Sequence, residues 1–303
     1  MPARQLLKTA VEQGLLWSGL PGISSRLRRS DTLILAYHDV VPDGERVAGD
    51  SSLHLPRAVF AAQLDALLEM AEVVSLEVAL SSGPTRSGRP RVAITFDDAY
   101  SGAVLSGVEE LTKRGLPATI FVPPALLDGG VFWWDALTPR GMPALPPDVR
   151  DDALLRLAGK GSAILAEYGC SDTSHVPAYA RGASEVELRG AAERAGITLA
   201  SHTWSHPNLA ALTPAELEEE LERPLAWLRE RFASVLPYIS YPYGHYSPAV
   251  ERAAAAAGYR AALRIEGGWL GDGNAHRFAI PRLNVPSGLS NAGFRLRCSG
   301  LLG

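Results

Sequence analysis

Cysteine is scarce in this 303-residue chain, and two other features are missing altogether. The two cysteines, Cys170 and Cys298, leave room for one disulfide, but they exclude a disulfide framework and a cysteine-rich zinc site. No stretch approaches the roughly 18 consecutive apolar residues that a membrane-spanning helix needs. The chain has no block of Lys or Arg and a net charge of -4, which argues against nucleic acid as a partner.

Short apolar runs instead alternate with helical patterns along the chain. With 47% hydrophobic and 20% charged residues, the composition is typical of a globular protein with a sizeable core. The alternation indicates βα units and a largely parallel sheet. Seven or eight strands in this rhythm predict an α/β fold and favour a (β/α) barrel over an open sheet. The expected strands are Thr32–His38, Val73–Leu76, Val92–Phe96, Ala118–Val122, Thr198–Ser201, Tyr238–Tyr241, Arg260–Ile265 and Phe278–Leu283.

Two helices have readable ends. Ser184 and Glu187 form a candidate capping box, and Gly196 can end that helix before the next strand. A second start signal over residues 213–216, with Thr, Pro and Glu in the expected order, opens a charged helix that runs to about residue 232.

The pattern divides the chain into a short extension and one domain. Residues 1–30 are expected to form an N-terminal helical extension, and residues 31–303 a single barrel domain. Two segments interrupt the rhythm of the domain. One is a polar loop at 42–56, and the other is an insertion at about 123–183 with one helical stretch near 151–168. Loops this long are usually functional or disordered.

The first residues resemble an export signal only superficially. Basic residues precede the apolar stretch Gly14–Ile23, but Glu12 and Gln13 interrupt the approach and no clean cleavage site follows. We interpret residues 3–18 as an amphipathic helix, with loose membrane association as a weaker alternative. A cytoplasmic or peripheral membrane location is expected, and the sequence does not indicate an oligomeric state.

Two adjacent carboxylates follow the strand expected at 92–96. The segment Thr95–Asp98 ends in Asp97 and Asp98, whose side chains point in different directions at a strand end and can take different roles. In parallel α/β barrels such strand ends face the active-site mouth. The alternative is structural, because Asp98 could cap a helix that begins near Ser101.

His202 and His206 follow another expected strand. Histidines four residues apart can face one ion if the residues between them make a helical turn, and imidazole suits zinc and similar metals. Alone this spacing is a weak signal, because two unrelated surface histidines would also produce it. Together with the carboxylates of a second strand end, it predicts a metal group of Asp98, His202 and His206.

Two further strand ends carry candidate catalytic groups. His38 could exchange protons at neutral pH, or it could be a buried histidine bonded to Asp39. The segment Tyr241–Gly244 could aim a main-chain N–H at a bound carbonyl, or it could be a plain turn. All these features lie at the carboxyl ends of expected parallel strands, where a barrel places its site.

Taken together, these motifs resemble those of the polysaccharide deacetylase family, the NodB-homology domain of carbohydrate esterases. The resemblance covers about residues 32–125 and 184–286 and implies a distorted (β/α) barrel. Thr95–Asp98 resembles the TFDD motif of the family. This likeness implies that Asp97 is the general base and that Asp98 is a metal ligand.

The other motifs complete the resemblance. His202 and His206 match the histidines of the H-[ST]-x-x-H motif, which implies that both bind the metal. Pro242–Gly244 matches the PYG turn, in which the main-chain N–H of Tyr243 would help to hold an oxyanion. The family implies a divalent metal, with Zn²⁺ preferred and Co²⁺, Mn²⁺ or Ni²⁺ as alternatives, and an N-acetylated saccharide as substrate.

The sequence departs from the family pattern at several positions. Ala99 replaces a frequent Gly, and Ser240 stands where many members have an Arg that orients the base. The usual general-acid histidine has no match, since Arg282 lies near its place, and we group Arg282 with the oxyanion- or substrate-contacting residues. A branch acting on poly-N-acetylglucosamine takes its acid from a histidine near the start of the domain. His38 resembles that histidine, and His276 is the alternative.

The insertion adds a candidate sugar contact. It carries Phe132–Asp135, and aromatic faces stack on sugar rings. We expect Trp134 or its neighbour Trp133 to line the substrate groove, and the alternative is a hydrophobic cluster that pins the insertion down.

The expected activity is removal of an acetyl group from an N-acetylated sugar. One alternative is a related metal-dependent hydrolase acting on other amides or O-acetyl esters. The other is a glycan-binding protein without activity, because the orienting Arg and the usual acid are absent. The intact carboxylates and histidines argue against a mere binder, which need not keep them.

Overall fold

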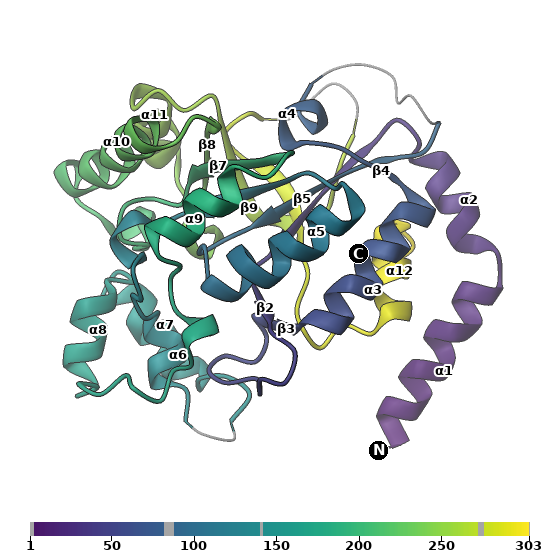
Figure 1. Ribbon diagram of the computed structural model, residues 1–303, viewed down its shortest axis with the longest axis horizontal. Coiled ribbons are helices and arrows are strands. Elements are labelled where there is room, and N and C mark those ends of the chain that lie inside the picture. Colours follow the sequence, from purple (N-terminus) through teal and green to yellow (C-terminus); the bar gives the residue numbers. More distant parts are fainter. Residues whose placement is uncertain (1–2, 82–87, 140–141, 272–275, 303) are drawn as a thin grey trace.

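Seven parallel strands close into a barrel in the computed structural model, which describes residues 3–81, 88–139, 142–271 and 276–302 (Figure 1). The sheet order is β1-β11-β9-β8-β7-β6-β5, and β1 pairs with β5 to complete the circle. These strands are β1 (Thr32–Tyr37), β5 (Arg91–Phe96), β6 (Ala118–Val122), β7 (Ile197–Ser201), β8 (Val235–Ser240), β9 (Ala261–Gly267) and β11 (Ile280–Asn284). The expected (β/α) barrel is confirmed.

Burial on both faces explains why the barrel strands are apolar nearly throughout. Every residue of β1 and β5 is buried. Because successive side chains alternate, Ile34 and Ala93 face Phe121 inside the barrel, whereas Leu33 and Val92 pack in the layer beneath the outer helices. Parallel strands covered on both sides therefore read as continuous hydrophobic runs.

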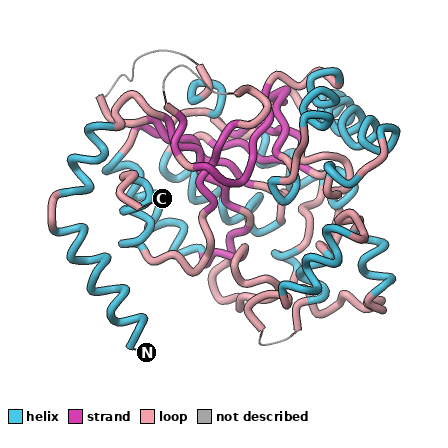
Figure 2. The backbone as a smooth tube through the Cα atoms, turned by 180° about the vertical axis from the view of Figure 1, so that it is seen from behind, coloured by secondary structure: helices cyan, strands magenta, loops and turns pink. Residues whose placement is uncertain are grey.

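Helices surround the barrel, as Figure 2 shows from behind. They are α3 (Arg57–Met70), α4 (Leu76–Ala79), α5 (Val108–Arg114) with a preceding π-turn at Ala103–Gly107, α9 (Glu185–Ala192), α10 (Pro214–Arg231), α11 (Pro248–Ala256) and α12 (Asn291–Cys298). The expected capping box at the start of α9 is confirmed, and α10 begins at the expected start signal, where the structure shows a second capping box. Gly196, at φ 84°, stands just before β7, four residues after α9 ends.

The described part of the insertion contains three α-helices, α6 (Trp133–Leu137), α7 (Pro147–Leu155) and α8 (Gly161–Glu167). The expected single helix near 151–168 is wrong, because the chain breaks at Ala158 (φ 52°) and Gly159 (φ 66°). A Cβ atom on Gly159 would lie 2.9 Å from the ring of Tyr243, so the break allows the backbone to pass close to a strand-end residue.

Two smaller expectations also need correction. The strand expected at Val73–Leu76 ends at Val73, because the Ser75 hydroxyl accepts from the N–H of Val78 and begins α4. The remaining piece, β4 (Glu72–Val73), lies beside β5 outside the closed barrel. The loop expected at 42–56 ends in a strand, β3 (His54–Pro56), which pairs in parallel with β2 (Asp39–Val41).

The N-terminal helices stand outside the barrel. Helices α1 (Ala3–Trp17) and α2 (Leu20–Leu27) lie on one flank of the molecule, where α1 contacts α12 (Figure 1). The short strand β10 (Trp269–Leu270) runs antiparallel to β1. Among the described residues, no helix combines the length and apolar character needed to cross a membrane.

Candidate active site and metal centre

Strand register brings the chemistry-bearing residues to one end of the barrel. Strands β1 and β5 pair in register up to Tyr37 and Phe96, so His38 and Asp97 are the next residues of two adjacent strands. In the same way, His202 follows the end of β7, and its N–H donates to the last carbonyl of β6 at 2.9 Å. The parallel direction of the strands thus gathers these side chains at one mouth.

Asp98, His202 and His206 meet at this mouth. The Oδ1 atom of Asp98 lies 3.4 Å from Nε2 of His202 and 3.2 Å from Nε2 of His206, and the two Nε2 atoms are 3.1 Å apart. Ligands at about 2.0–2.1 Å around a tetrahedral zinc ion are separated by about 3.3 Å. All three side chains are buried, so the group has the spacing and enclosure to bind one metal ion.

The charge and tautomer of the group also suit a metal. The Nδ1 atom of His202 donates to the carbonyl of Ser240 at 2.8 Å, which leaves its Nε2 lone pair free to coordinate. Burial opposes a charge on Asp98, but His206 and His202 outweigh it and hold the pKa of Asp98 well below its usual range. The carboxylate is therefore ionised, as a ligand must be.

The loop between the two histidines is not the helical turn that their spacing suggested. Thr203 and His206 adopt φ values of 65° and 63°, which bring the imidazoles together without a helix. Glu220 of α10 holds this loop, because its carboxylate accepts hydrogen bonds from the N–H groups of Trp204 and Ser205 at 2.9 and 2.8 Å. Sequence reasoning missed Glu220, which looks like any other acidic residue of a charged helix.

Left-handed backbone is concentrated at the site. Seven non-glycine residues of the described chain have positive φ, and five of them lie in three strand-end loops. These five are Asp98, Ala99, Thr203, His206 and Tyr243. Such conformations cost of order 1–3 kcal/mol each and persist where the surrounding structure imposes them, commonly at active sites.

Arg282 holds Asp97. Its fully buried guanidinium donates to Oδ1 and Oδ2 of Asp97 at 2.8 and 2.7 Å, and to Ser240 Oγ at 2.7 Å. The Ser240 hydroxyl in turn donates to Asp97 Oδ2 at 3.1 Å. The Arg282 guanidinium is thus engaged by Asp97 and Ser240 inside the barrel, and its expected contact with an oxyanion or substrate stays a prediction.

This pairing replaces the Arg that the sequence lacks at position 240. Burial would raise the pKa of Asp97, but the charges of Arg282 and His202 outweigh it and lower that pKa to about 2. Asp97 is thus an oriented carboxylate that is ionised at neutral pH. The lack of an orienting Arg was one argument for a glycan-binding protein without activity. Arg282 removes that argument, because it orients Asp97 from another strand.

His38 lines the cavity beside both aspartates. The alternative of a bond to Asp39 is not realised, because the Asp39 carboxylate pairs with His54 at 2.8 Å. Burial lowers the pKa of His38, which Asp98 and Asp97 only partly offset. His276 is 64% exposed and lies 3.7 Å from Glu251, as expected of a surface residue.

A cavity of about 440 Å³ opens over the metal group. The strand ends form its floor, and the insertion contributes Trp134 and Arg150 to its wall. Trp133 is turned differently, since its indole N–H donates to the Tyr243 hydroxyl at 2.9 Å. The structure therefore places Trp134 at the cavity and assigns Trp133 to the cluster that pins the insertion.

A buried charge network ties the insertion to the barrel. His54 is fully buried, and its two ring nitrogens lie 2.8 Å from Asp39 and 2.9 Å from Asp135 of α6. Asp135 also accepts a hydrogen bond from the Tyr100 hydroxyl at 2.7 Å. The Tyr100 hydroxyl in turn accepts a hydrogen bond from Trp134 Nε1 at 2.9 Å. The chain of bonds fixes Trp134, and nothing in the local sequence signals it.

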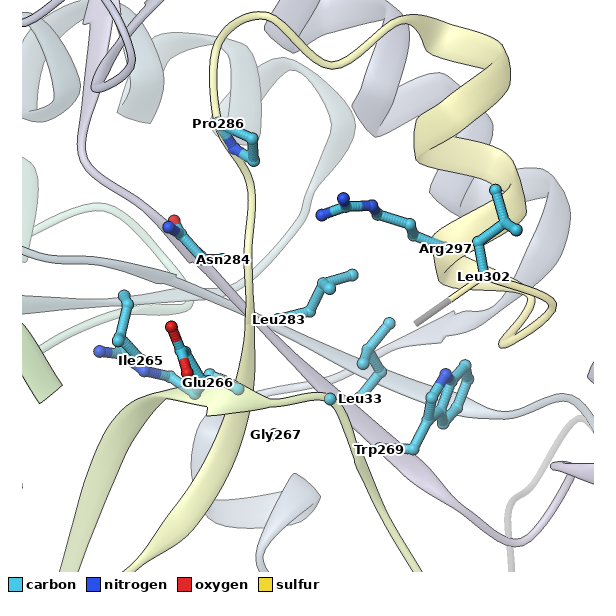
Figure 3. A pocket seen from close by; sticks show the side chains of 12 residues that line it. Leu33, Ile265, Glu266, Gly267, Trp269, Leu283, Asn284, Pro286, Arg297 and Leu302 are labelled. Carbon is cyan, nitrogen blue, oxygen red and sulfur yellow. The ribbon is translucent and has the colours of Figure 1, made fainter. Parts of the chain in front are cut away.

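A second cavity of about 490 Å³ adjoins the first (Figure 3). The two share Ile265, Glu266 and Asn284 in their linings. The second is mostly apolar, and Figure 3 shows Arg297 and Trp269 at its margin.

Comparison with known proteins identifies similar sequences and folds. The polysaccharide deacetylase profile matches residues 151–262. YxkH of Bacillus subtilis, a candidate polysaccharide deacetylase, is 24% identical over 264 residues, which cover 86% of this chain and 74% of YxkH.

Solved structures share the barrel. The Streptococcus pyogenes deacetylase PplD, determined with acetate, has a TM-score of 0.59 and 17% identity, covering 87% of this chain and 96% of PplD. IcaB from Ammonifex degensii has a TM-score of 0.58 and 16% identity, covering 89% of this chain and 97% of IcaB. At these identities the likeness shows the fold.

Proposed function

We propose that this chain is a polysaccharide deacetylase, which hydrolyses the acetamide of an N-acetylated sugar with a metal ion held by Asp98, His202 and His206. The convergence of these three ligand atoms beside the Asp97–Arg282 pair carries the proposal. Two imidazoles and one carboxylate suit zinc, with Co²⁺, Mn²⁺ or Ni²⁺ as substitutes. When bound, such an ion would polarise the acetamide carbonyl and lower the pKa of a water molecule.

Asp97 acts as the general base. Its carboxylate is ionised at neutral pH and is held in one orientation by Arg282, so it is ready to accept a proton from the attacking water. As the water oxygen bonds to the carbonyl carbon, negative charge develops on the acetamide oxygen. We assign the main-chain N–H of Tyr243, in the turn that lines the same cavity, to stabilise this charge.

His38 acts as the general acid. The C–N bond breaks when the sugar nitrogen receives a proton, because an unprotonated amide nitrogen is a poor leaving group. His38 follows the end of β1, next to the end of β5 that carries Asp97, and it lines the same cavity, so its imidazolium form is placed to donate that proton. The products are acetate and the free amino sugar. Trp134 offers an apolar surface for the sugar ring in the cavity wall.

The test is acetate release by the purified full chain. We expect metal in near-equimolar amount by elemental analysis, and acetate from N-acetylglucosamine oligomers that stops with a chelator and resumes with added Zn²⁺ or Co²⁺. Release from O-acetylated saccharides alone would instead indicate an esterase. Sugar binding without acetate release in the presence of Zn²⁺, Co²⁺ and Mn²⁺ would show a glycan-binding protein and overturn the proposal.

A further inference from the structure

Helices α1 and α2 expose a concentration of apolar side chains. Six of the fifteen exposed large hydrophobic residues in the described chain belong to these two helices: Leu7, Val11, Trp17, Leu20, Ile23 and Leu27. We call these six residues the α1–α2 apolar face. Trp17 is 87% exposed and Leu27 is 80% exposed. Large exposed apolar patches are rare on monomeric proteins and commonly mark interaction sites.

The spacing of five of these residues places them in one row on their helix. Leu7 and Val11 are four residues apart on α1, and Leu20, Ile23 and Leu27 follow at intervals of three and four on α2. Side chains at these intervals form a continuous stripe.

Helix α1 packs unlike a usual surface helix, which turns its apolar side chains toward the core of the protein. Among residues 7–17 of α1, the one fully buried residue is acidic: Glu12 is 6% exposed and accepts a hydrogen bond from the Ser290 hydroxyl, next to α12, at 2.6 Å. A polar contact thus helps to attach α1 to the protein, together with the half-buried Leu15 and Leu16, while Leu7 and Val11 are mostly exposed. Because the protein itself leaves these two side chains mostly exposed, they are available to contact an apolar partner outside it.

Positive charge borders the apolar face. Five of the six charged residues in positions 1–30 are cationic, whereas the whole chain has a net charge of -4. Arg26 and Arg29 are exposed, and neither forms an ion pair with any described residue. Arg28 instead attaches the end of α2 to β10, since its guanidinium lies 5.2 Å from the ring centre of Trp269. The free cations complement an anionic surface.

We propose that the α1–α2 apolar face docks this protein on an anionic lipid surface, with Trp17 and Leu27 entering the interface and Arg26 and Arg29 meeting lipid headgroups. Apolar side chains beside cations, with an aromatic ring, are the features of helices that lie in a membrane interface. The two helices occupy one flank outside the barrel in both views (Figures 1 and 2), so docking leaves the strand ends unaltered. The inference is independent of the proposed reaction.

Sedimentation of the full chain with lipid vesicles tests this proposal. We expect binding to phosphatidylcholine vesicles that contain phosphatidylglycerol to be at least about tenfold tighter than to phosphatidylcholine alone, and to weaken with salt. A Trp17→Ser/Leu27→Ser variant should lose binding to both. An Arg26→Gln/Arg29→Gln variant should lose the preference for phosphatidylglycerol.

A matched control separates docking from general stickiness. Leu155 on α7 and Val186 on α9 are 70% and 80% exposed but lie outside the apolar face. A Leu155→Ser/Val186→Ser variant should bind vesicles like the parent. Failure of the parent to bind anionic vesicles, or unchanged binding by the Trp17/Leu27 variant, would refute docking. A parent dimer that the Trp17/Leu27 substitutions dissociate, without vesicle binding, would assign the face to a second copy instead.

Discussion

Asp97 and Asp98 are neighbours in sequence, yet their surroundings give them different chemistry. Both oxygens of Asp97 accept from Arg282, whereas Asp98 faces His202 and His206. The side chains diverge at the end of β5, where Asp98 adopts φ 71°. At the scale of single residues, orientation and partner therefore separate a base from a ligand.

Substitution of each aspartate should have a different effect. Asp97→Asn is expected to lower kcat/KM by about 10²–10⁴-fold while metal content is retained, because the general base is lost but the ligands remain. Asp98→Asn should lower metal content itself. Elemental analysis and acetate release of both variants, with circular dichroism to verify folding, make the comparison. Equal metal loss in the two would contradict this division of roles.

Arg282 should control the pH range in which Asp97 is ionised. The folded pKa of Asp97 is about 2, below its ordinary value of 3.8, so the pairing contributes stability above pH 3.8 that is lost as pH falls through about 2. In Arg282→Gln the pKa of Asp97 should rise, and activity should decline at mildly acidic pH where the parent keeps it. The measurement is kcat/KM against pH.

Ser240→Ala provides the graded comparison for Arg282. It removes a single hydroxyl from the same group and leaves both guanidinium contacts to Asp97 in place. Its pH profile should therefore move less than that of Arg282→Gln. A profile for Arg282→Gln that matches the parent, at any lowered rate, would mean that Arg282 has only a structural role.

At the scale of elements, α10 supports the metal loop from behind. The helix begins at Pro214 with a capping box. Glu220, in its second turn, then accepts a hydrogen bond from the loop. The loop has left-handed residues on both sides of this contact, at Thr203 and His206. Such a loop keeps its shape because main-chain N–H groups find a fixed acceptor on a rigid helix.

Glu220→Gln should weaken metal binding without removing a ligand. We expect a loss of about 10–100-fold in metal affinity, as for other outer partners that orient metal ligands. Glu219→Gln is the matched control, because Glu219 is 65% exposed and pairs with Arg223 on the solvent side. Metal titration of both variants tests this. Equal affinities would show that the loop holds its shape without Glu220.

At the scale of the whole molecule, buried charges join the insertion to the barrel. His54 of β3 bridges Asp39 of β2 and Asp135 of α6, so three separate segments share one hydrogen-bonded group. Burial would lower the pKa of His54, but the two carboxylates outweigh it and raise that pKa to about 10. His54 is therefore a buried imidazolium at neutral pH.

His54→Gln should destabilise the protein in a pH-dependent way. Breaking a buried ion pair typically costs about 3–5 kcal/mol, so the free energy of unfolding should fall by at least about 3 kcal/mol at neutral pH. Because the folded pKa is above the unfolded value of 6.5, this contribution is complete below pH 6.5 and is lost as pH rises through about 10. Denaturant unfolding at several pH values measures the difference.

The matched control for this substitution is His276→Gln, since His276 is 64% exposed. Its free energy of unfolding should match that of the parent at every pH. A constant difference between His54→Gln and the parent from neutral pH to about pH 10 would show that His54 is uncharged in the folded protein.

Local patterns explain why much of this protein can be predicted before its structure is known. Apolar runs and helix start signals depend on residues a few positions apart, so the barrel strands, the capping box of α9 and the start of α10 could be predicted from the sequence. The positions of Asp98, His202 and His206 at strand ends followed as well. The helix break at Ala158–Gly159 was not predicted, because it depends on a contact with Tyr243, which is distant in sequence.

The partners of the buried charges lie beyond any local pattern. From the sequence alone, Ser240 suggests that no arginine orients the base Asp97. In the structure Arg282, which lies 185 positions after Asp97 and on another strand, donates hydrogen bonds to the Asp97 carboxylate. His54 and Asp135 are 81 positions apart and carry no motif. Such pairs depend on the order and register of the strands around the closed barrel, because these decide which side chains face each other. A hydrogen bond requires its two atoms to lie about 3 Å apart, and only the folded structure determines that distance.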